Sequence, residues 1–242
     1  MIMEDVKPYD KTTSKKEQIY RMFNAISDKY DISNTVLSLG IHHYWKKKCV
    51  QILKPYQPKK ILDLATGTAD IAIQLTRLNP QHIIAADYAD NMLSIAQKKI
   101  NDKKLNHLIT VQKEDGENLS FENNTFDAIT ISFGIRNFEN YKKGLAEMLR
   151  VLKPGGILLI LEFSMPKNIF FKNIYTLYFK IILPLMAWII TGDKKAYDYL
   201  PNSVVAFPRY DDFCNIIQQQ GFSQCRYIPL TGGIATIYLA KK

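Results

Sequence analysis

The chain has 242 residues, of which 47% are hydrophobic and 23% are charged. This length and balance suit one globular α/β domain with additional elements, large enough to bury a sizeable core. Cys49, Cys214 and Cys225 are far apart and form no CxxC pair, which argues against a structural zinc site or a disulfide framework and favours a reducing cytoplasm. Residues 1–16 are polar and charged, so no signal peptide is expected there.

The net charge of +9 is unevenly distributed. Residues 1–60 contain twelve Lys and Arg against six Asp and Glu, which is two thirds of the excess. A basic face of this kind can meet nucleic acid, anionic lipid or only solvent. The longest apolar run, 181–190, has ten residues, whereas a helix needs about 20 to cross a bilayer. We interpret this run as a buried helix, a membrane-surface element or a wall of an apolar pocket.

Hydrophobic periodicity predicts a helical region over 15–54, followed by alternating strands and helices. Strands are expected at 60–65, 82–87, 108–112, 126–133 and 156–162, and helices at 71–78, 91–100 and 141–152. After residue 163 the alternation stops for about 45 residues. The chain then continues with a helix at 210–220 and strands at 225–229 and 234–240, joined by Leu230-Thr-Gly-Gly233.

These elements predict a Rossmann-like α/β fold, with a seven-stranded, mostly parallel sheet and helices on both faces. The last two strands should form a hairpin that contributes one antiparallel strand. N-terminal helices and a helical insertion before the last two strands complete the fold. We expect a single domain, 1–242, in four parts: a helical cap (1–56), a cofactor-binding core (57–163), a helical insertion toward substrate or membrane (164–208) and a closing helix with the hairpin (209–242).

The segment Asp63-Leu-Ala-Thr-Gly-Thr-Ala-Asp70 joins the first predicted strand to a helix. Such a loop can hold a nucleotide-like cofactor, because Gly67 lets the backbone approach a ligand and the helix N-terminus offers free amides. Ala65 and Ala69 stand where many such loops have glycine, so by glycine content alone the signal is weak. The G-x-G-x-x-G that a dinucleotide-binding oxidoreductase needs is absent.

Polar residues end the next predicted strands at the same sheet edge. Asp87 ends the second strand and can accept hydrogen bonds from both hydroxyls of a ribose. Asp115-Gly116 follows the third strand, where an adenine edge would lie, and Ser132 ends the fourth. Each position also has a plain structural interpretation, with Asp87 as a helix cap and Asp115-Gly116 as a turn. Because these positions lie in register with the loop, we expect the edge to hold S-adenosylmethionine.

Five segments resemble the quinone-biosynthesis C-methyltransferases, the family that methylates demethylmenaquinol and the related polyprenyl-benzoquinol of ubiquinone synthesis. They are 22–31 (Met-Phe-Asn-Ala-Ile-Ser-Asp-Lys-Tyr-Asp), 40–46, 131–137 (Ile-Ser-Phe-Gly-Ile-Arg-Asn), 161–164 and 229–233. The resemblance extends over nearly the whole chain and implies the class I S-adenosylmethionine-dependent methyltransferase fold. Ala69 departs from the family's T-G-T-G-D, and we expect it to tighten the loop slightly without abolishing binding, since Thr68 and Asp70 remain.

The resemblance implies that Thr68, Asp87, Asp115, Gly116 and Ser132 contact S-adenosylmethionine. With the loop residues, the expected cofactor site comprises Asp63, Gly67, Thr68, Asp87, Asp115, Gly116 and Ser132.

The resemblance also gives Arg136 and Asn137 a catalytic role. Carbon methylation of a quinol needs an electron-rich ring close to the phenolate form, and it requires no metal. Because an arginine with a pKa above about 12 is a poor proton acceptor, our hypothesis is that Arg136 stabilises the quinol oxyanion. A carboxylate or a bound water then takes the proton.

Four further residues, Tyr30, Asp31, His42 and Tyr199, are candidates for lining the substrate pocket, although packing or capping explains each of them as well. The apolar stretch 169–191 is interpreted as a lid or tunnel for an isoprenoid tail, with basic flanks that face anionic lipid; an ordinary buried helix is the alternative. These features lead us to expect a cytoplasmic protein, peripheral at the inner face of the cell membrane, able to form a homo-oligomer.

Three other functions compete with quinol methylation. A nucleic-acid N-methyltransferase commonly carries (D/N)-P-P-(Y/F) after the fourth strand, where this chain has Ser132-Phe-Gly-Ile135, so no nucleic-acid partner is expected. A small-molecule O-methyltransferase remains open, because phenolate activation serves both reactions. A non-catalytic cofactor-binding module is the third. Among quinols, the resemblance favours the naphthoquinol of menaquinone synthesis, with the benzoquinol of ubiquinone synthesis as the alternative.

Overall fold

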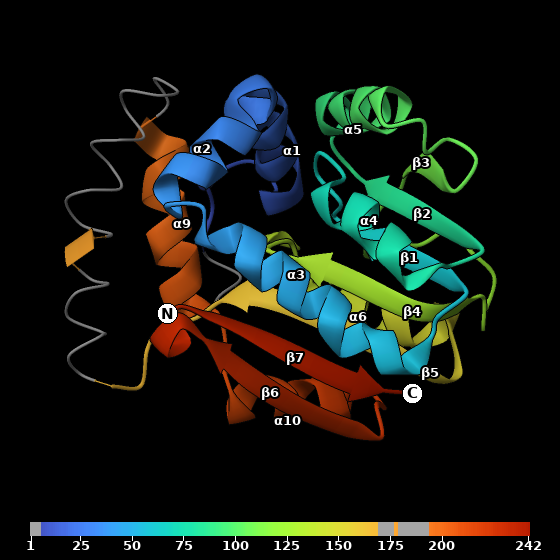
Figure 1. The fold of residues 1–242 in the computed structure, drawn as a ribbon. Helices are drawn as coiled ribbons and strands as arrows, with labels where there is room; N and C mark the ends of the chain where they lie inside the picture. Colours follow the sequence, from blue (N-terminus) through green and yellow to red (C-terminus); the bar gives the residue numbers. More distant parts are fainter. Residues whose placement is uncertain (1–5, 169–176, 179–193) are drawn as a thin grey trace.

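The computed structural model describes residues 6–168, 177–178 and 194–242. In this part of the chain seven strands form one sheet in the order β3-β2-β1-β4-β5-β7-β6 (Figure 1). The strands are β1 (Lys60–Leu64), β2 (His82–Asp87), β3 (Ile109–Lys113), β4 (Phe126–Ser132), β5 (Leu152–Phe163), β6 (Gln224–Leu230) and β7 (Ala235–Lys241). The first five pair in parallel, and β7 runs antiparallel to both β5 and β6. The predicted fold class is confirmed.

Alternate strand residues pack on opposite faces of the sheet, because successive side chains of a strand point to opposite sides. Ile61 and Ile83 belong to one buried core, whereas Leu62 and Ile129 belong to the other. The strands are apolar on both faces for this reason, as the sequence suggested. The first core is covered by α3 (Ile41–Leu53), α4 (Asp70–Leu75) and α5 (Asp90–Asp102), and the second by α6 (Tyr141–Val151) and α10 (Asp211–Gln219).

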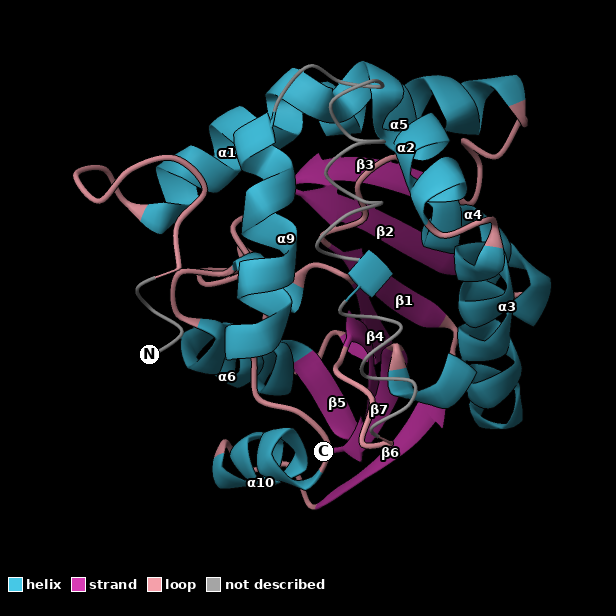
Figure 2. Ribbon diagram, turned by 90° about the vertical axis from the view of Figure 1, so that its left-hand side faces the viewer, coloured by secondary structure: helices cyan, strands magenta, loops and turns pink. Residues whose placement is uncertain are grey.

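The predicted N-terminal helical region is broken into α1 (Lys15–Ile26), α2 (Tyr30–Leu37) and α3. Ser14 caps α1, since its side chain accepts a hydrogen bond from the amide of Glu17. The break before α3 follows from Leu39 and Gly40, which adopt φ of 50° and 75°, a left-handed conformation that ends a helix. Viewed from the side, α1 and α2 lie beyond the carboxyl ends of the parallel strands together with α9 (Lys194–Ala206) (Figure 2).

The predicted insertion 164–208 is described only in part. Its residues 164–168, 177–178 and 194–208 are described, and the apolar run 181–190 lies outside the described residues, as does most of 169–191. Among the helices that the structure describes, none combines the length and the apolarity that a membrane span requires.

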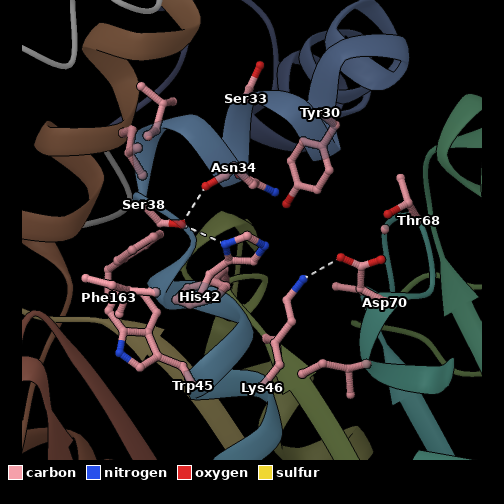
Figure 3. Close-up of a pocket in the computed structure, with 18 of the residues that line it drawn as sticks. Tyr30, Ser33, Asn34, Ser38, His42, Trp45, Lys46, Thr68, Asp70 and Phe163 are labelled. Carbon is pink, nitrogen blue, oxygen red and sulfur yellow. Dashed lines mark hydrogen bonds and ion pairs between the residues drawn. The ribbon is translucent and has the colours of Figure 1, made fainter. Parts of the chain in front are cut away.

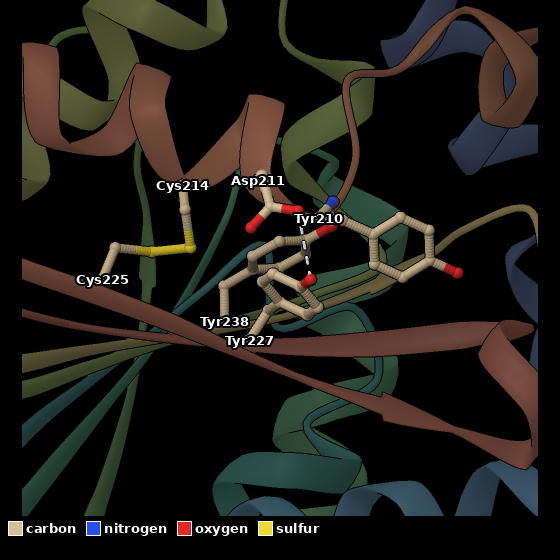
Figure 4. The surroundings of a disulfide bond; sticks show 6 residues. All are labelled: Tyr210, Asp211, Cys214, Cys225, Tyr227 and Tyr238. Atoms are coloured by element: carbon tan, nitrogen blue, oxygen red, sulfur yellow. Dashed lines mark hydrogen bonds between the residues drawn. A yellow bond between two sulfur atoms is a disulfide. The ribbon is translucent and has the colours of Figure 1, made fainter. Parts of the chain in front are cut away.

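The expectation that the cysteines form no disulfide is wrong for one pair. Cys214 of α10 and Cys225 of β6 are bonded, with their Cα atoms 5.4 Å apart (Figure 4). They are eleven residues apart in sequence, and only the packing of α10 against the hairpin brings them together. Cys49 is a free, buried thiol.

We expect thiol counting to report this bond. Alkylation of the unfolded chain without reductant should modify one cysteine, Cys49, and all three after reduction. Replacing Cys214 and Cys225 together by alanine should lower the free energy of unfolding by about 3 kcal/mol, because the unfolded chain loses the constraint of a short closed loop. Mass spectrometry after alkylation and urea unfolding measure the two effects. Three modified thiols before reduction would contradict the bond.

Candidate active site

Two adjoining hollows lie at the carboxyl edge of the parallel strands. The larger has a cavity volume of about 330 Å³ and the smaller about 90 Å³. Residues from α1, α2, the β1–α4 loop and the end of β4 line both hollows: Phe23, Tyr30, Ala65, Gly67, Ser132 and Phe133. The helical cap and the core therefore build one composite site.

The smaller hollow gathers five of the predicted cofactor residues, Gly67, Asp87, Asp115, Gly116 and Ser132. The carboxylate of Asp87 accepts hydrogen bonds from the amides of Gly67 at 2.8 Å and Ala89 at 2.9 Å. Burial raises the pKa of Asp87, although the hydrogen bonds from these amides act to lower it. Asp87 therefore connects the loop to the second strand while it lines the hollow.

Asp115 and Gly116 form a turn, which was the structural interpretation of this pair in the sequence. The carboxylate of Asp115 accepts a hydrogen bond from the amide of Glu117 at 3.0 Å. Asp115 is also ion-paired with Lys16 of α1. Gly116 has no room for a side chain, because an added Cβ would lie 2.3 Å from Cζ of Phe138. The Lys16–Asp115 pair was not predicted, and its 99-residue separation leaves no local signal.

Ser132 provides an observation that points to a ligand. Its hydroxyl is buried and has no hydrogen-bond partner in the described part of the chain, yet it lines both hollows. A buried hydroxyl without a partner costs about 1–3 kcal/mol. A polar group of a bound molecule would satisfy it, so these residues fit the predicted cofactor.

The loop before α4 keeps the backbone shape of a glycine-rich loop despite its alanines. Ala65, Gly67 and Ala69 all have positive φ, at 52°, 57° and 64°. For a residue with a Cβ this conformation costs about 1–2 kcal/mol. Asp63 connects the loop to strand β4, because its carboxylate accepts hydrogen bonds from the hydroxyls of Thr66 in the loop and Thr130 in β4, both at 2.6 Å.

Asp63 is buried, and burial raises its pKa to about 6. A carboxyl whose pKa is higher in the folded state stabilises the fold least when it is ionised. We therefore expect Asp63→Asn to gain stability relative to the unchanged protein, by about 2–3 kcal/mol, as the pH rises from 4 to 7. Urea unfolding of both proteins across this range measures the difference between their free energies of unfolding. Other titrating groups contribute equally to both proteins, so their effect cancels in this difference. A difference independent of pH would contradict the raised pKa.

Thr68 is held by the cap. Its hydroxyl donates to the carboxylate of Asp31 at 2.6 Å and accepts from the ammonium of Lys99 at 3.1 Å. Lys99 also pairs with Asp31 at 2.9 Å and with Asp70, and Asp70 accepts from Lys46 at 2.9 Å. This network joins α2, α3 and α5 to the loop, and Lys46 and Lys99 were not predicted as site residues.

Arg136 and Asn137 lie on the 3₁₀ turn after β4 but face different hollows, with Arg136 in the wall of the larger and Asn137 in that of the smaller. Arg136 donates to Glu162 at 2.8 Å and to the carbonyl of Phe133 at 2.6 Å. Its Nε has no partner in the described part of the chain. Asn137 accepts from the hydroxyl of Tyr199 at 3.1 Å.

Glu162 was not predicted as a partner of Arg136, although it lies in the quoted segment 161–164. Its side chain is 0% exposed and that of Arg136 is 7% exposed. Burial raises the pKa of Glu162, and Arg136 opposes that effect. The arginine is therefore held in place by a buried ion pair.

The wall of the larger cavity is mainly apolar, and Figure 3 shows part of it, including Trp45 and Phe163. Of the four residues expected to line the substrate pocket, Tyr30, His42 and Tyr199 lie in the wall of this cavity. Asp31 does not, and it binds Thr68 and Lys99 instead. No cluster of three or more potential metal ligands occurs among the described residues. The apolar part of the wall of the larger cavity includes Met22, Phe23, Ile26, Leu37, Leu39, Ile41, Trp45, Phe133, Phe163, Leu200 and Ile234.

Comparisons with known proteins identify the family of this chain. Residues 11–242 match the model of the ubiE/COQ5 methyltransferase family. A demethylmenaquinone methyltransferase of Bacteroides fragilis is 43% identical over 99% of this chain and 98% of its own. One of Deinococcus radiodurans is 38% identical over 100% of both chains. A ubiquinone/menaquinone biosynthesis C-methyltransferase UbiE of Geobacter sp. strain M21 is 40% identical over 95% of this chain and 98% of its own.

Solved structures share the fold. A methyltransferase of Thermotoga maritima, described as a possible histamine N-methyltransferase, has a TM-score of 0.65 at 17% identity and covers 93% of this chain and 99% of that chain. Phosphoethanolamine N-methyltransferase 2 of Haemonchus contortus, in complex with S-adenosyl-L-methionine, has a TM-score of 0.58 at 17% identity. The match covers 81% of this chain and 52% of that chain. At these identities the likeness concerns the fold alone.

Proposed function

This chain belongs to the ubiE/COQ5 methyltransferase family, and from that premise we propose that it methylates a ring carbon of demethylmenaquinol to give menaquinol. As a member of the family it is an S-adenosylmethionine-dependent methyltransferase of quinone biosynthesis. The observation that carries the finer proposal is the mainly apolar cavity of about 330 Å³ that shares a wall with the predicted cofactor hollow.

The cofactor supplies a methyl group on a positively charged sulfur. In the proposal, Asp87 binds the ribose hydroxyls, Asp115 and Gly116 border the adenine, and Ser132 donates its unpartnered hydroxyl. Gly67 lets the loop backbone approach the ligand.

Three tasks remain for the residues of the larger cavity: to orient the ring, to exclude water and to stabilise negative charge on a ring oxygen. Trp45, Phe133 and Phe163 form a contacting aromatic group in its wall, with ring centroids 4.3 to 6.1 Å apart. They suit a flat apolar ring and keep water away from it. Arg136, held by Glu162, supplies positive charge, and its buried Nε–H has no hydrogen-bond partner among the described residues.

The direct test is an anaerobic assay with the purified protein, S-adenosylmethionine and one reduced acceptor at a time. The acceptors are a demethylmenaquinol, a 2-polyprenyl-6-methoxy-1,4-benzoquinol and a small catechol, with methylated products identified by mass spectrometry. We expect kcat/KM for the naphthoquinol to be at least about tenfold higher than for the others. A preference for the benzoquinol would establish the second candidate, which the relatives of Geobacter named for both quinones support. A preference for the catechol would overturn both.

A further inference from the structure

Ser38 and His42 form a polar pair in the wall of the larger cavity, between the apolar residues Leu37, Leu39 and Ile41. Ser38 follows the end of α2 and His42 lies in the first turn of α3. The left-handed Leu39-Gly40 turn between the helices brings the two side chains together. The Ser38 hydroxyl lies 2.6 Å from Nδ1 of His42 (Figure 3).

The contacts of Ser38 determine where the imidazole carries its proton. The Ser38 hydroxyl also lies 2.6 Å from the carbonyl oxygen of Asn34, which can only accept a hydrogen bond. The single hydroxyl proton is therefore directed to Asn34, so the same oxygen accepts from Nδ1–H of His42. Burial, and then the charge of Lys46, lowers the pKa of His42 to about 4, so the ring is neutral at pH 7. Nε2 is left with a free lone pair.

That lone pair accepts no hydrogen bond from the residues that the structure describes, and the nearby Lys46 donates to Asp70. In Figure 3 Nε2 lies on the side of the ring away from Ser38, toward Tyr30 and Lys46. The His42 side chain is buried in the molecule and lines the cavity. An acceptor nitrogen in the cavity wall that lacks a hydrogen-bond partner favours a ligand that brings an O–H or N–H donor.

We propose that His42 recognises the oxidation state of the substrate: Nε2 accepts a hydrogen bond from a ring hydroxyl of a hydroquinone and repels the carbonyl oxygen of the quinone. This inference rests on the proposed function and adds a residue that distinguishes the reduced from the oxidised ring. The distinction matters chemically because only the hydroquinone ring is electron-rich enough to accept a methyl cation equivalent. Ser38 acts as a positioning residue, since it fixes the tautomer of His42.

The test is equilibrium dialysis under argon with S-adenosylhomocysteine present, using a 2-prenyl-1,4-naphthohydroquinone and its quinone as probes. Binding is measured without methyl transfer. We expect the unchanged protein to bind the hydroquinone at least about tenfold more tightly than the quinone. A buried donor or acceptor without a hydrogen-bond partner costs at least about as much free energy as a tenfold change in affinity represents. His42→Phe should bind the two forms within twofold. His42→Gln, whose amide can donate as well as accept, should bind the quinone more tightly than the unchanged protein does.

Two further variants separate the role of His42 from a general loss of structure. Ser38→Ala frees the tautomer, so Nε2–H becomes available and the preference for the hydroquinone should fall. His43→Phe is the matched control, because His43 is exposed and does not line the cavity, although its ring centroid lies 3.9 Å from that of His42. This variant should keep the preference. Unfolding midpoints show whether each variant folds.

Two outcomes distinguish the possible failures. Equal binding of both forms by the unchanged protein, or a preference that persists in both His42→Phe and His42→Gln, would overturn the role of His42 alone. Binding of neither form would overturn the proposed function as well.

Discussion

Replacing Arg136 with methionine is expected to lower the free energy of unfolding by about 3–5 kcal/mol, because the Glu162 carboxylate then remains buried without a counter-charge and keeps only hydrogen bonds from backbone amides such as that of Phe163. Glu162 is 0% exposed and accepts from the guanidinium at 2.8 Å. Urea unfolding at pH 7 measures the loss. Without Arg136 the pKa of Glu162 rises further above its usual range, so protonation relieves the cost, and the loss should shrink as the pH falls toward 5.

The double variant Arg136→Met with Glu162→Leu separates stability from chemistry. Replacing a buried ion pair by apolar side chains of similar volume is often neutral or stabilising, so the double variant should recover most of the lost stability. It should not recover methyl transfer, because the cavity then lacks the charge proposed to stabilise the ring oxyanion. Full stability together with near-normal kcat would show that Arg136 has only a structural role.

Arg136→Lys tests whether a positive charge at this position is sufficient for methyl transfer. Lysine keeps the charge, but it lacks the Nε–H and the planar guanidinium whose Nη1 donates to both Glu162 and Phe133. We expect the variant to fold and to lose most of kcat while KM changes little. Near-full turnover in this variant would contradict the proposed role of the guanidinium.

The sheet could be predicted from the sequence because each buried strand is a short apolar run bounded by turn residues. The strand ends also placed Asp87, Asp115 and Ser132 at one edge, since parallel strands bring their carboxyl ends together. All three line the smaller hollow. Local periodicity was sufficient for these features because strand direction follows from the alternation of strands and helices.

The parts that could not be predicted depend on how distant segments dock. Lys16 meets Asp115 across 99 residues and Lys99 meets Asp31 across 68, and periodicity contains no information on such pairs. The Cys214–Cys225 bond depends in the same way on the position of α10 against the hairpin. The break between α2 and α3 had a local signal in Gly40, which the amphipathic pattern on either side concealed.

Asp87→Asn is expected to weaken S-adenosylmethionine binding by about 100-fold. The carboxylate accepts from the amides of Gly67 and Ala89 on its two oxygens. An asparagine presents an NH₂ group to one of these N–H donors, which leaves a buried donor unsatisfied at a cost of about 1–3 kcal/mol. The proposed hydrogen bonds to two ribose hydroxyls are also reduced to one good acceptor. Isothermal titration calorimetry measures the change in Kd.

Asp90→Asn is the matched control for Asp87→Asn. Asp90 lies three residues further on, at the start of α5, where its half-exposed carboxylate pairs with Lys113 at 2.8 Å and accepts from Tyr20 at 2.7 Å. It does not line the smaller hollow, and exposed pairs of this kind contribute about 0–1 kcal/mol. We therefore expect its Kd to stay within twofold of that of the unchanged protein. Equal losses in both variants would mean that Asp87 acts through the general charge of this surface, whereas a loss confined to Asp87→Asn places the ribose at the end of β2.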